Sequence, residues 1–211
     1  MKLKKLLSID CRFKYNKGRD WIKIMNTFVI LETERLVLRT WNEGDLDTYY
    51  QINQDQRVTE FLLITPTLEQ VKEFIHSMNE QYRRINYTLF AAIEKSSNRL
   101  IGFIGLNPPK WESHFTPCVE IGWRLGSQYW GKGYATEGAK AVLAYGFNQC
   151  HLNEIVSFTV SENIRSRRVM EKLGMTHDIA DDFNHPLVPP DHQLLKHVLY
   201  RINRQKHMES R

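Results

Sequence analysis

Apolar and polar residues follow two different periods along the chain, and the pattern predicts strands that alternate with helices. Short apolar runs bounded by turn residues indicate strands. The segments with this character are residues 34–41, 87–93, 99–106, 118–125, 155–160 and 194–202. The second and third are joined by the turn sequence EKSSN, which is typical of a hairpin.

Helical spacing of apolar residues appears between these strands. Thr67 and Gln70 form a capping box directly after Pro66, and an amphipathic run follows them. Further helices are predicted at residues 44–53 and 163–173, the second ending at Gly174. A helix after the fourth strand has one apolar face, made by Ala135, Ala139, Val142, Leu143 and Gly146. The elements predict an α/β fold in a single domain, with helices flanking a mixed, largely antiparallel twisted sheet.

The predicted domain spans residues 26–205, with a short tail at 206–211. Residues 1–25 form either a disordered basic extension or an over-long start whose true initiator is Met25. Their apolar core is too short for an export signal, which uses about 7 to 15 apolar residues.

Charge and cysteine usage narrow the function class. The net charge of +5 is concentrated near the N-terminus, where residues 1–23 hold eight Lys or Arg against two Asp. The body shows no basic stripe, so the charge favours a solvated surface over a specific nucleic-acid module. The 3 cysteines are widely separated, which predicts neither a disulfide framework nor a zinc ribbon and favours a reducing cytoplasm. No apolar run approaches the roughly 18 residues of a membrane span.

The stretch CVEIGWRLGSQYWGKGYAT at residues 118–136 carries the clearest chemical signal. It predicts a strand, a loop with Gly131 and Gly133, and then a helix start, where free backbone amides bind phosphate. A nucleotide triphosphate loop would need a Lys and then Ser or Thr after its last glycine, and a dinucleotide fingerprint would need a glycine where Thr136 stands. A turn without a ligand is the alternative for the loop taken alone.

Two motifs resemble the GCN5-related N-acetyltransferases (GNAT), in particular the group of ribosomal-protein alanine acetyltransferases. The family loop [QR]-x-x-G-x-[GA] is matched by Gly133 and Ala135, with Trp130 where Gln or Arg is usual. A second register from Gln128 also fits, but it separates the loop from the helix start. The run NIRSRRVMEKLGM, from Asn163, is similar to a second family pattern, and the likeness spans residues 28–204.

The resemblance implies a GNAT-like sheet in which the strand at 118–125 splays from its neighbour, and it implies acetyl-CoA as the co-substrate. Asn163 is then expected to contact the pantetheine arm. The backbone of the splayed strand pairs with pantetheine and the glycine loop holds the pyrophosphate, so the expected cofactor-binding residues are Trp123, Leu125, Trp130, Gly131, Lys132, Gly133, Tyr134, Ala135, Thr136 and Asn163.

Acetyl transfer to an amine needs a base for the amine proton and a donor for the leaving thiolate. Glu120 is the candidate base, because the alternation of Val119, Ile121, Trp123 and Leu125 on one face places it on the other. The same resemblance assigns a Glu at this position that role. The alternative is a surface carboxylate paired with a neighbouring strand.

Ser166 is the candidate thiolate partner, since it shares a helix face with apolar residues and the resemblance implies a hydroxyl near the CoA sulfur. Tyr134 is the second candidate for this role. Asn163 and an inward Ser166 are also ordinary helix-capping and packing residues. A covalent route with Cys118 as nucleophile and His114 as base is disfavoured, because direct transfer needs no such intermediate.

The predicted function is acetyl transfer from acetyl-CoA to a primary amine, either a protein N-terminus or a small molecule. A catalytically silent acyl-CoA-binding domain on the same fold is the alternative. His185, His192 and His197 are interpreted as a structural or substrate-side loop rather than a metal site. Core packing is the first interpretation of Trp41, Tyr49, Tyr50 and Trp111, and lining of the acceptor cleft the second. The resemblance also implies a homodimer, since that oligomeric state is common in the family.

Overall fold

The computed structural model describes residues 27–209; the predicted extension at 1–25 lies outside them. The described strands are β1 (Val29–Glu32), β2 (Leu36–Arg39), β3 (Leu89–Glu94), β4 (Arg99–Asn107), β5 (Glu120–Leu125), β6 (Glu154–Val160), β7 (Thr176–His177), β8 (Phe183–Asn184) and β9 (Lys196–Asn203). The helices are α1 (Leu46–Gln54), α2 (Gln56–Thr59), α3 (Leu68–Ile85), α4 (Tyr134–Asn148), α5 (Ile164–Lys172) and α6 (Arg204–Glu209), with short 3-10 turns η1 (Glu43–Asp45), η2 (Ser127–Tyr129) and η3 (Ile179–Asp181).

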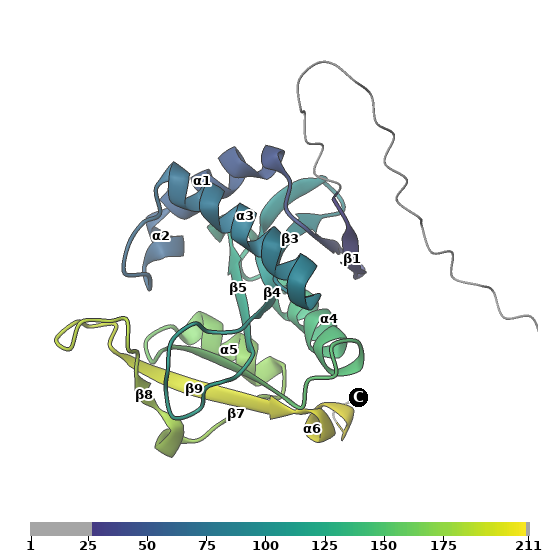
Figure 1. Cartoon of the computed structure of the whole chain (residues 1–211). Coiled ribbons are helices and arrows are strands. Elements are labelled where there is room, and N and C mark those ends of the chain that lie inside the picture. Colours follow the sequence, from purple (N-terminus) through teal and green to yellow (C-terminus); the bar gives the residue numbers. More distant parts are fainter. Residues whose placement is uncertain (1–26, 210–211) are drawn as a thin grey trace, which may run out of the picture.

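The strands form one sheet in the order β1-β2-β3-β4-β5-β6-β9-β7, with β8 added beside β9 (Figure 1). Among the described strands, every pairing is antiparallel except that of β5 with β6. This arrangement confirms the predicted mixed, largely antiparallel α/β fold.

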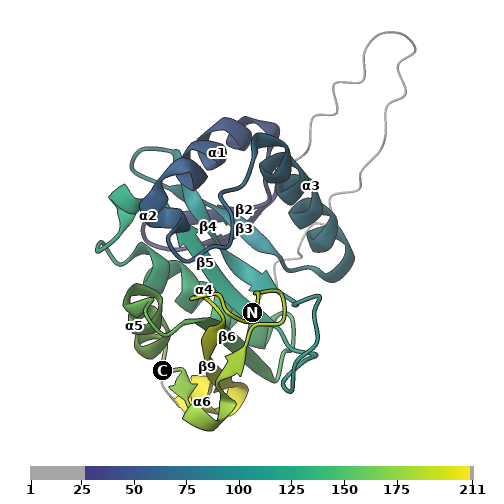
Figure 2. The same ribbon diagram turned by 90° about the vertical axis from the view of Figure 1, so that its left-hand side faces the viewer.

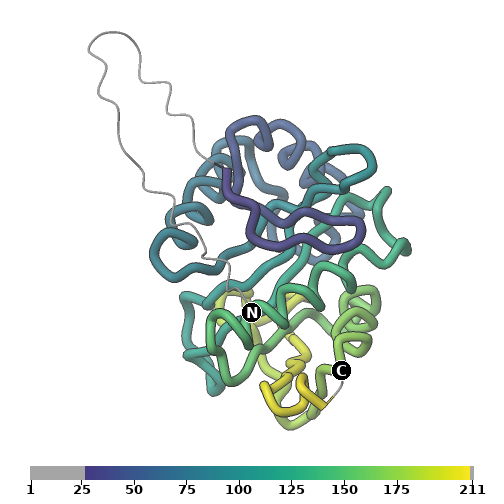
Figure 3. Tube along the Cα trace, turned by 90° about the vertical axis from the view of Figure 1, so that its right-hand side faces the viewer, coloured from purple at the N-terminus to yellow at the C-terminus, as the bar shows by residue number. Residues whose placement is uncertain are grey.

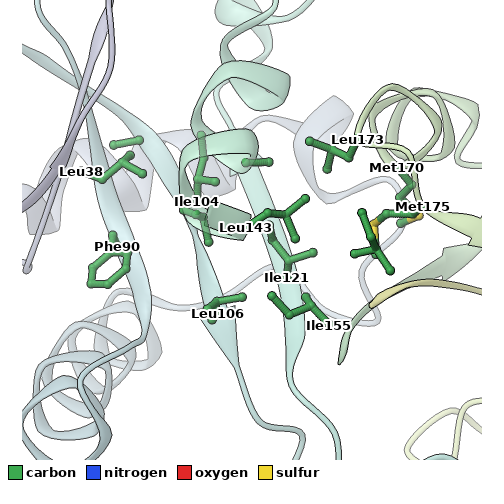
Figure 4. Packing of buried hydrophobic residues seen from close by; sticks show 14 of the residues in the cluster. Leu38, Phe90, Ile104, Leu106, Ile121, Leu143, Ile155, Met170, Leu173 and Met175 are labelled. Atoms are coloured by element: carbon green, nitrogen blue, oxygen red, sulfur yellow. The ribbon is translucent and has the colours of Figure 1, made fainter. Parts of the chain in front are cut away.

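Helices cover both faces of the sheet because successive strand residues point to opposite sides. On β3, Phe90 and Ala92 join the large cluster under α4 and α5, whereas Ala91 and Ile93 join a second cluster under α1 and α3. The two layers are visible in Figures 1 and 2, with α1 and α3 on one side of the sheet and α4 on the other. Figure 4 shows the large cluster, in which Ile121 of β5 lies beside Leu143 of α4.

Several predicted element boundaries need correction. The predicted strand at 118–125 begins at Glu120, and the one at 34–41 is confined to β2. The elements β1, β7, β8, α2 and α6 were not predicted, because each has six residues or fewer and too few positions to show a period. The capping box of α3 is confirmed, with Thr67 and Gln70 exchanging side chain to backbone hydrogen bonds. Within residues 27–209 no helix is both long and apolar enough to cross a membrane.

Candidate active site

The sheet opens between β5 and β6. β5 pairs with β4 along its whole length, but it meets β6 only where Glu120 lies opposite Val156. Just beyond that point the Ser157 hydroxyl donates a hydrogen bond of 2.9 Å to the Ile121 carbonyl. β6 meanwhile continues its pairing with β9. The two strands therefore diverge as expected, and on this side residues Trp123 to Leu125 of β5 pair with no other described strand.

The glycine loop follows β5 and leads directly into α4. Gly131 and Gly133 have φ of 73° and 84°, a left-handed conformation that glycine adopts without steric cost. Gly133 occupies the N-cap position of the 15-residue α4, and no side chain there caps the first backbone amides. Free amides together with the helix dipole make this helix start suited to an anion.

The β1–β2 turn holds the loop in place from the other side, as Figure 3 shows for the purple hairpin beside the green α4. The Arg35 Nε lies 2.6 Å from Glu137 Oε2, and its Nη1 donates to the Lys132 carbonyl at 2.9 Å. The Thr33 hydroxyl donates to the other carboxylate oxygen of Glu137 at 2.6 Å. The positioning role of Thr33, Arg35 and Glu137 was not predicted from the sequence. The one local signal was Glu137, an acidic residue in the first turn of α4.

Trp130 and Arg165 pack against each other and connect the glycine loop with α5. The Trp130 indole N–H donates to the Leu125 carbonyl at 2.8 Å, and the Arg165 guanidinium lies 4.6 Å from its ring centroid. Arg165 also pairs with Glu60, just after α2, at 2.5 Å. The residue that departs from the family pattern thus serves as a packing surface that ties the loop to β5 and α5.

Glu120 sits where the strands part, on the same face of the sheet as Val156. Its partly buried carboxylate makes no hydrogen bond or ion pair with any described residue, so it is not the paired surface carboxylate of the alternative interpretation. Desolvation raises the pKa of Glu120 to about 8. A Cβ placed on Gly122 would lie 3.8 Å from its Oε1, so the carboxylate extends along β5 beside the diverging strands.

Ser166 lies across the gap from Glu120's strand, at the start of α5. The Trp123 indole N–H reaches over from β5 and donates to the Ser166 Oγ at 3.2 Å. The Asn163 Oδ1 accepts the Ser166 backbone N–H at 3.2 Å, and its Nδ2 donates to the Thr159 hydroxyl at 3.0 Å. Asn163 is therefore the N-cap of α5. Hydrogen bonds connect Trp123, Ser166, Asn163 and Thr159 into one group.

Tyr134 points elsewhere. Its buried ring lies under the Arg35 guanidinium, and its hydroxyl donates to the Glu94 carboxylate at the end of β3. That hydrogen bond raises the pKa of Tyr134. The Tyr134 hydroxyl hydrogen is thus bound to the Glu94 carboxylate of β3, whereas the Ser166 hydroxyl lies against Trp123 of β5.

Cys118 and His114 do not form a nucleophile and base pair. Burial raises the pKa of the Cys118 thiol to about 11, which disfavours the reactive thiolate. The His114 Nε2 instead lies 3.8 Å from an Asp181 carboxylate oxygen. The His114 ring is thus engaged with η3, and direct transfer without a covalent intermediate stays a prediction.

The histidines of the C-terminal region are placed in two different ways. His185 and His197 have ring centroids 4.9 Å apart, whereas the His192 Nδ1 accepts the Leu194 backbone N–H. Across residues 27–209, no group of three or more His, Cys, Asp or Glu side chains is arranged to hold a metal ion. Trp41 and Tyr49 are buried, as their first interpretation as core residues requires, while Trp111 is only partly buried.

Comparison with known proteins agrees with this geometry. Residues 35–176 match the model of the acetyltransferase (GNAT) domain. The chain is 33% identical over 146 residues to the uncharacterized N-acetyltransferase p20 of Bacillus licheniformis, covering 68% of this chain and 80% of the relative. It is also 33% identical over 149 residues to the uncharacterized N-acetyltransferase YnaD of Bacillus subtilis, covering 70% and 83%.

Solved structures show the same fold. A GNAT-family acetyltransferase from Bacillus anthracis superposes with a TM-score of 0.66 at 28% identity, covering 82% of this chain and 96% of that one. A spermidine N-acetyltransferase from Vibrio cholerae, solved with CoA and spermine, gives a TM-score of 0.65 at 17% identity, covering 83% and 99%. Together with the match to the domain model, these likenesses show that the chain is an N-acetyltransferase and belongs to the GNAT family.

Proposed function

We propose that acetyl-CoA binds in the gap between β5 and β6 and that its acetyl group is transferred directly to a primary amine next to Glu120. The observation that carries this proposal is the divergence of the two strands at Glu120, which leaves a strand edge, a phosphate-binding helix start and a desolvated carboxylate around one opening. The residues present fit the co-substrate, because the left-handed Gly133 leaves the amides at the start of α4 without a side-chain cap.

Two sets of residues are proposed to hold acetyl-CoA. The backbone of Trp123 and Leu125 offers an unpaired strand edge to the pantetheine arm. The loop and first helical turn, residues 130–136, offer backbone amides to the pyrophosphate, and the exposed Lys132 adds a positive charge. Asn163 is proposed to hold Ser166 in place through its cap, and its own contact with pantetheine stays a prediction.

Acetyl-CoA supplies the acetyl group as a thioester. Glu120 is proposed to accept the proton of the attacking amine, since its raised pKa makes it a stronger base than an ordinary carboxylate. Ser166 is proposed to donate a hydrogen bond to the departing thiolate. The Trp123 N–H already donates to the Ser166 Oγ, so the hydroxyl hydrogen remains available for that purpose.

The finer assignments belong to the same proposal. The acceptor is either a peptide N-terminus, as in the ribosomal-protein acetyltransferases, or a small-molecule amine. A cytoplasmic location and a homodimer stay predictions, and sedimentation of the purified chain measures the second.

The test is release of CoA thiol from acetyl-CoA with a panel of amines and short peptides, beside a calorimetric titration of acetyl-CoA. We expect saturable binding and amine-dependent release above hydrolysis. Binding without any amine-dependent release would support the silent domain instead. Absence of binding would overturn the proposal as a whole.

A further inference from the structure

Four partly exposed rings form a continuous surface on the Glu120 side of the sheet. Trp111 lies 5.4 Å from Phe158 and 4.8 Å from His185, and His185 lies 4.9 Å from His197, measured between ring centroids. The rings come from the β4–β5 loop, β6, the segment after β8, and β9. We call Trp111, Phe158, His185 and His197 the aromatic wall.

The aromatic wall packs against a buried apolar cluster. Behind the exposed rings lie Phe115, Val156, Phe183 and Leu199, which form a buried cluster. The Trp111 ring stacks on Phe183 at 5.8 Å, and the Phe183 ring also lies 5.6 Å from His197. Side chains fixed in this way lose little conformational entropy when a ligand binds.

The wall begins beside the proposed base. Glu120 and Val156 are lateral partners, so their side chains point to the same face of the sheet. Phe158 is two residues further along β6 and therefore on that face as well, at the level where β5 has diverged. An amine held at Glu120 would therefore share this face with Phe158, against which Trp111 packs.

The strands of this face offer few free carboxylates to a second cationic group. Its carboxylates on β5, β6 and β9 are Glu120 and Glu154, and Glu154 pairs with Arg201 at 2.9 Å. Asp181, from the neighbouring η3, pairs with the same guanidinium at 2.7 Å. Burial lowers the pKa of His185, and lowers that of His197 to about 4, so both imidazoles are uncharged at neutral pH. A polyamine would find only Glu120 available among these groups.

We propose that the acceptor is a primary amine with an aromatic ring a few bonds from its nitrogen, and that this ring packs on the aromatic wall. The inference rests on the proposed function and specifies its substrate class. Both an arylalkylamine and a peptide whose first residue is aromatic present this chemistry. Ring–ring contacts with the wall favour such an amine over a saturated one of similar size.

The first test compares matched substrates of the unaltered enzyme. Phenethylamine and 2-cyclohexylethylamine have similar size but differ in aromaticity, and Phe-Ala and Ala-Ala extend the comparison to peptides. We expect kcat/KM to be about 3 to 10 times higher for the aromatic member of a pair. If the aromatic preference appears for the two amines but not for the two dipeptides, the acceptor is a small molecule. If it appears for the dipeptides alone, the acceptor is a peptide. Equal values in both pairs, or a preference for spermidine, would overturn the inference while leaving acetyl transfer established. If no amine reacts, the proposed function fails and the inference with it.

The second test locates the contact. Trp111→Ala is expected to bring the phenethylamine to cyclohexylethylamine ratio close to one, whereas Trp111→Phe retains most of it. Because both rates are measured in the same variant, a loss of folded protein cancels. Tyr87→Ala is the matched control, since Tyr87 is a partly buried aromatic residue packed against the large cluster and outside the wall. Titration calorimetry of phenethylamine with the CoA-bound enzyme should show the same loss in Trp111→Ala. An unchanged ratio in Trp111→Ala would contradict the assignment.

Discussion

Glu120→Gln tests the proposed base with almost no change in shape. Glutamine keeps the size of the side chain and removes its ability to accept a proton at any accessible pH. The carboxylate makes no hydrogen bond or ion pair with the described residues, so the substitution breaks no such contact. We expect kcat/KM for the amine to fall by roughly 10² to 10⁴-fold, the usual contribution of a positioned general base. The affinity for acetyl-CoA should stay the same, because its expected contacts are the backbone of Trp123 and Leu125 and the glycine loop, not the Glu120 side chain.

The pH dependence of kcat/KM gives a more specific test of Glu120 than the loss of activity. Desolvation raises the pKa of Glu120 to about 8. With that value about one molecule in ten has the ionised base at pH 7 and about nine in ten at pH 9, so its contribution to kcat/KM rises about tenfold between them. An ordinary glutamate, with a pKa near 4.3, would give a flat profile over the same range.

The assay must separate Glu120 from the amine, whose own ammonium also titrates. Thiol release is therefore measured for the unaltered enzyme and for Glu120→Gln from pH 6 to 10, with one amine at concentrations below KM. The ratio of the two kcat/KM values cancels the titration of the substrate. We expect this ratio to rise through pH 8 and to level off above pH 9. A ratio that is independent of pH, or close to one, would refute the role of Glu120 as base.

Two further substitutions, and the stability of the Glu120→Gln variant, probe neighbouring parts of the site and the fold. Gly133→Ala places a Cβ at φ 84° and 3.4 Å from Arg35 Nη2, so we expect a loss of about 1 kcal/mol in stability and a weaker calorimetric affinity for CoA. Ser166→Ala removes the acceptor of the Trp123 N–H; we expect kcat to fall with little change in the acetyl-CoA Kd, and an unchanged kcat would exclude the serine from thiolate stabilisation. Glu120→Gln should also change stability with a defined sign. The folded pKa near 8 exceeds the ordinary 4.5, so ionisation weakens the folded state as pH rises through this window. The variant should therefore gain in melting temperature relative to the parent between pH 5 and pH 9, and a constant difference would contradict the raised pKa.

The sequence predicted those parts of the site that depend on neighbouring residues. The left-handed glycines and the start of α4 follow from steric freedom and from a helical period within one short stretch, at Gly131 to Thr136. The caps at Thr67 and Asn163 follow from side chains that reach a backbone amide three residues away. The alternation around Glu120 placed it opposite the apolar face for the same local reason.

Other features needed the whole fold. The β1–β2 turn contacts the glycine loop through the hydrogen bond from Arg35 to the Lys132 carbonyl, and these residues are 97 positions apart in sequence. Trp111 could be interpreted as core or as cleft, and only the fold shows that it packs against His185 and Phe158. The two-residue strands β7 and β8 exist because β9 lies alongside to pair with them.

The amino-acid sequence by itself determined the class of fold, and through the family resemblance it predicted an anion-binding loop, acetyl-CoA as co-substrate and Glu120 as the candidate base. Tertiary structure decided that the Glu120 carboxylate is desolvated and has no ion-pair partner among the described residues. It also decided that Ser166 and not Tyr134 contacts Trp123 of β5, and that aromatic rings gather on the Glu120 face of the sheet. The reason is physical. Backbone conformation and periodicity are set by interactions between near neighbours, whereas the pKa of Glu120 and the surroundings of the acceptor depend on which distant strands part and which side chains fill the space between them.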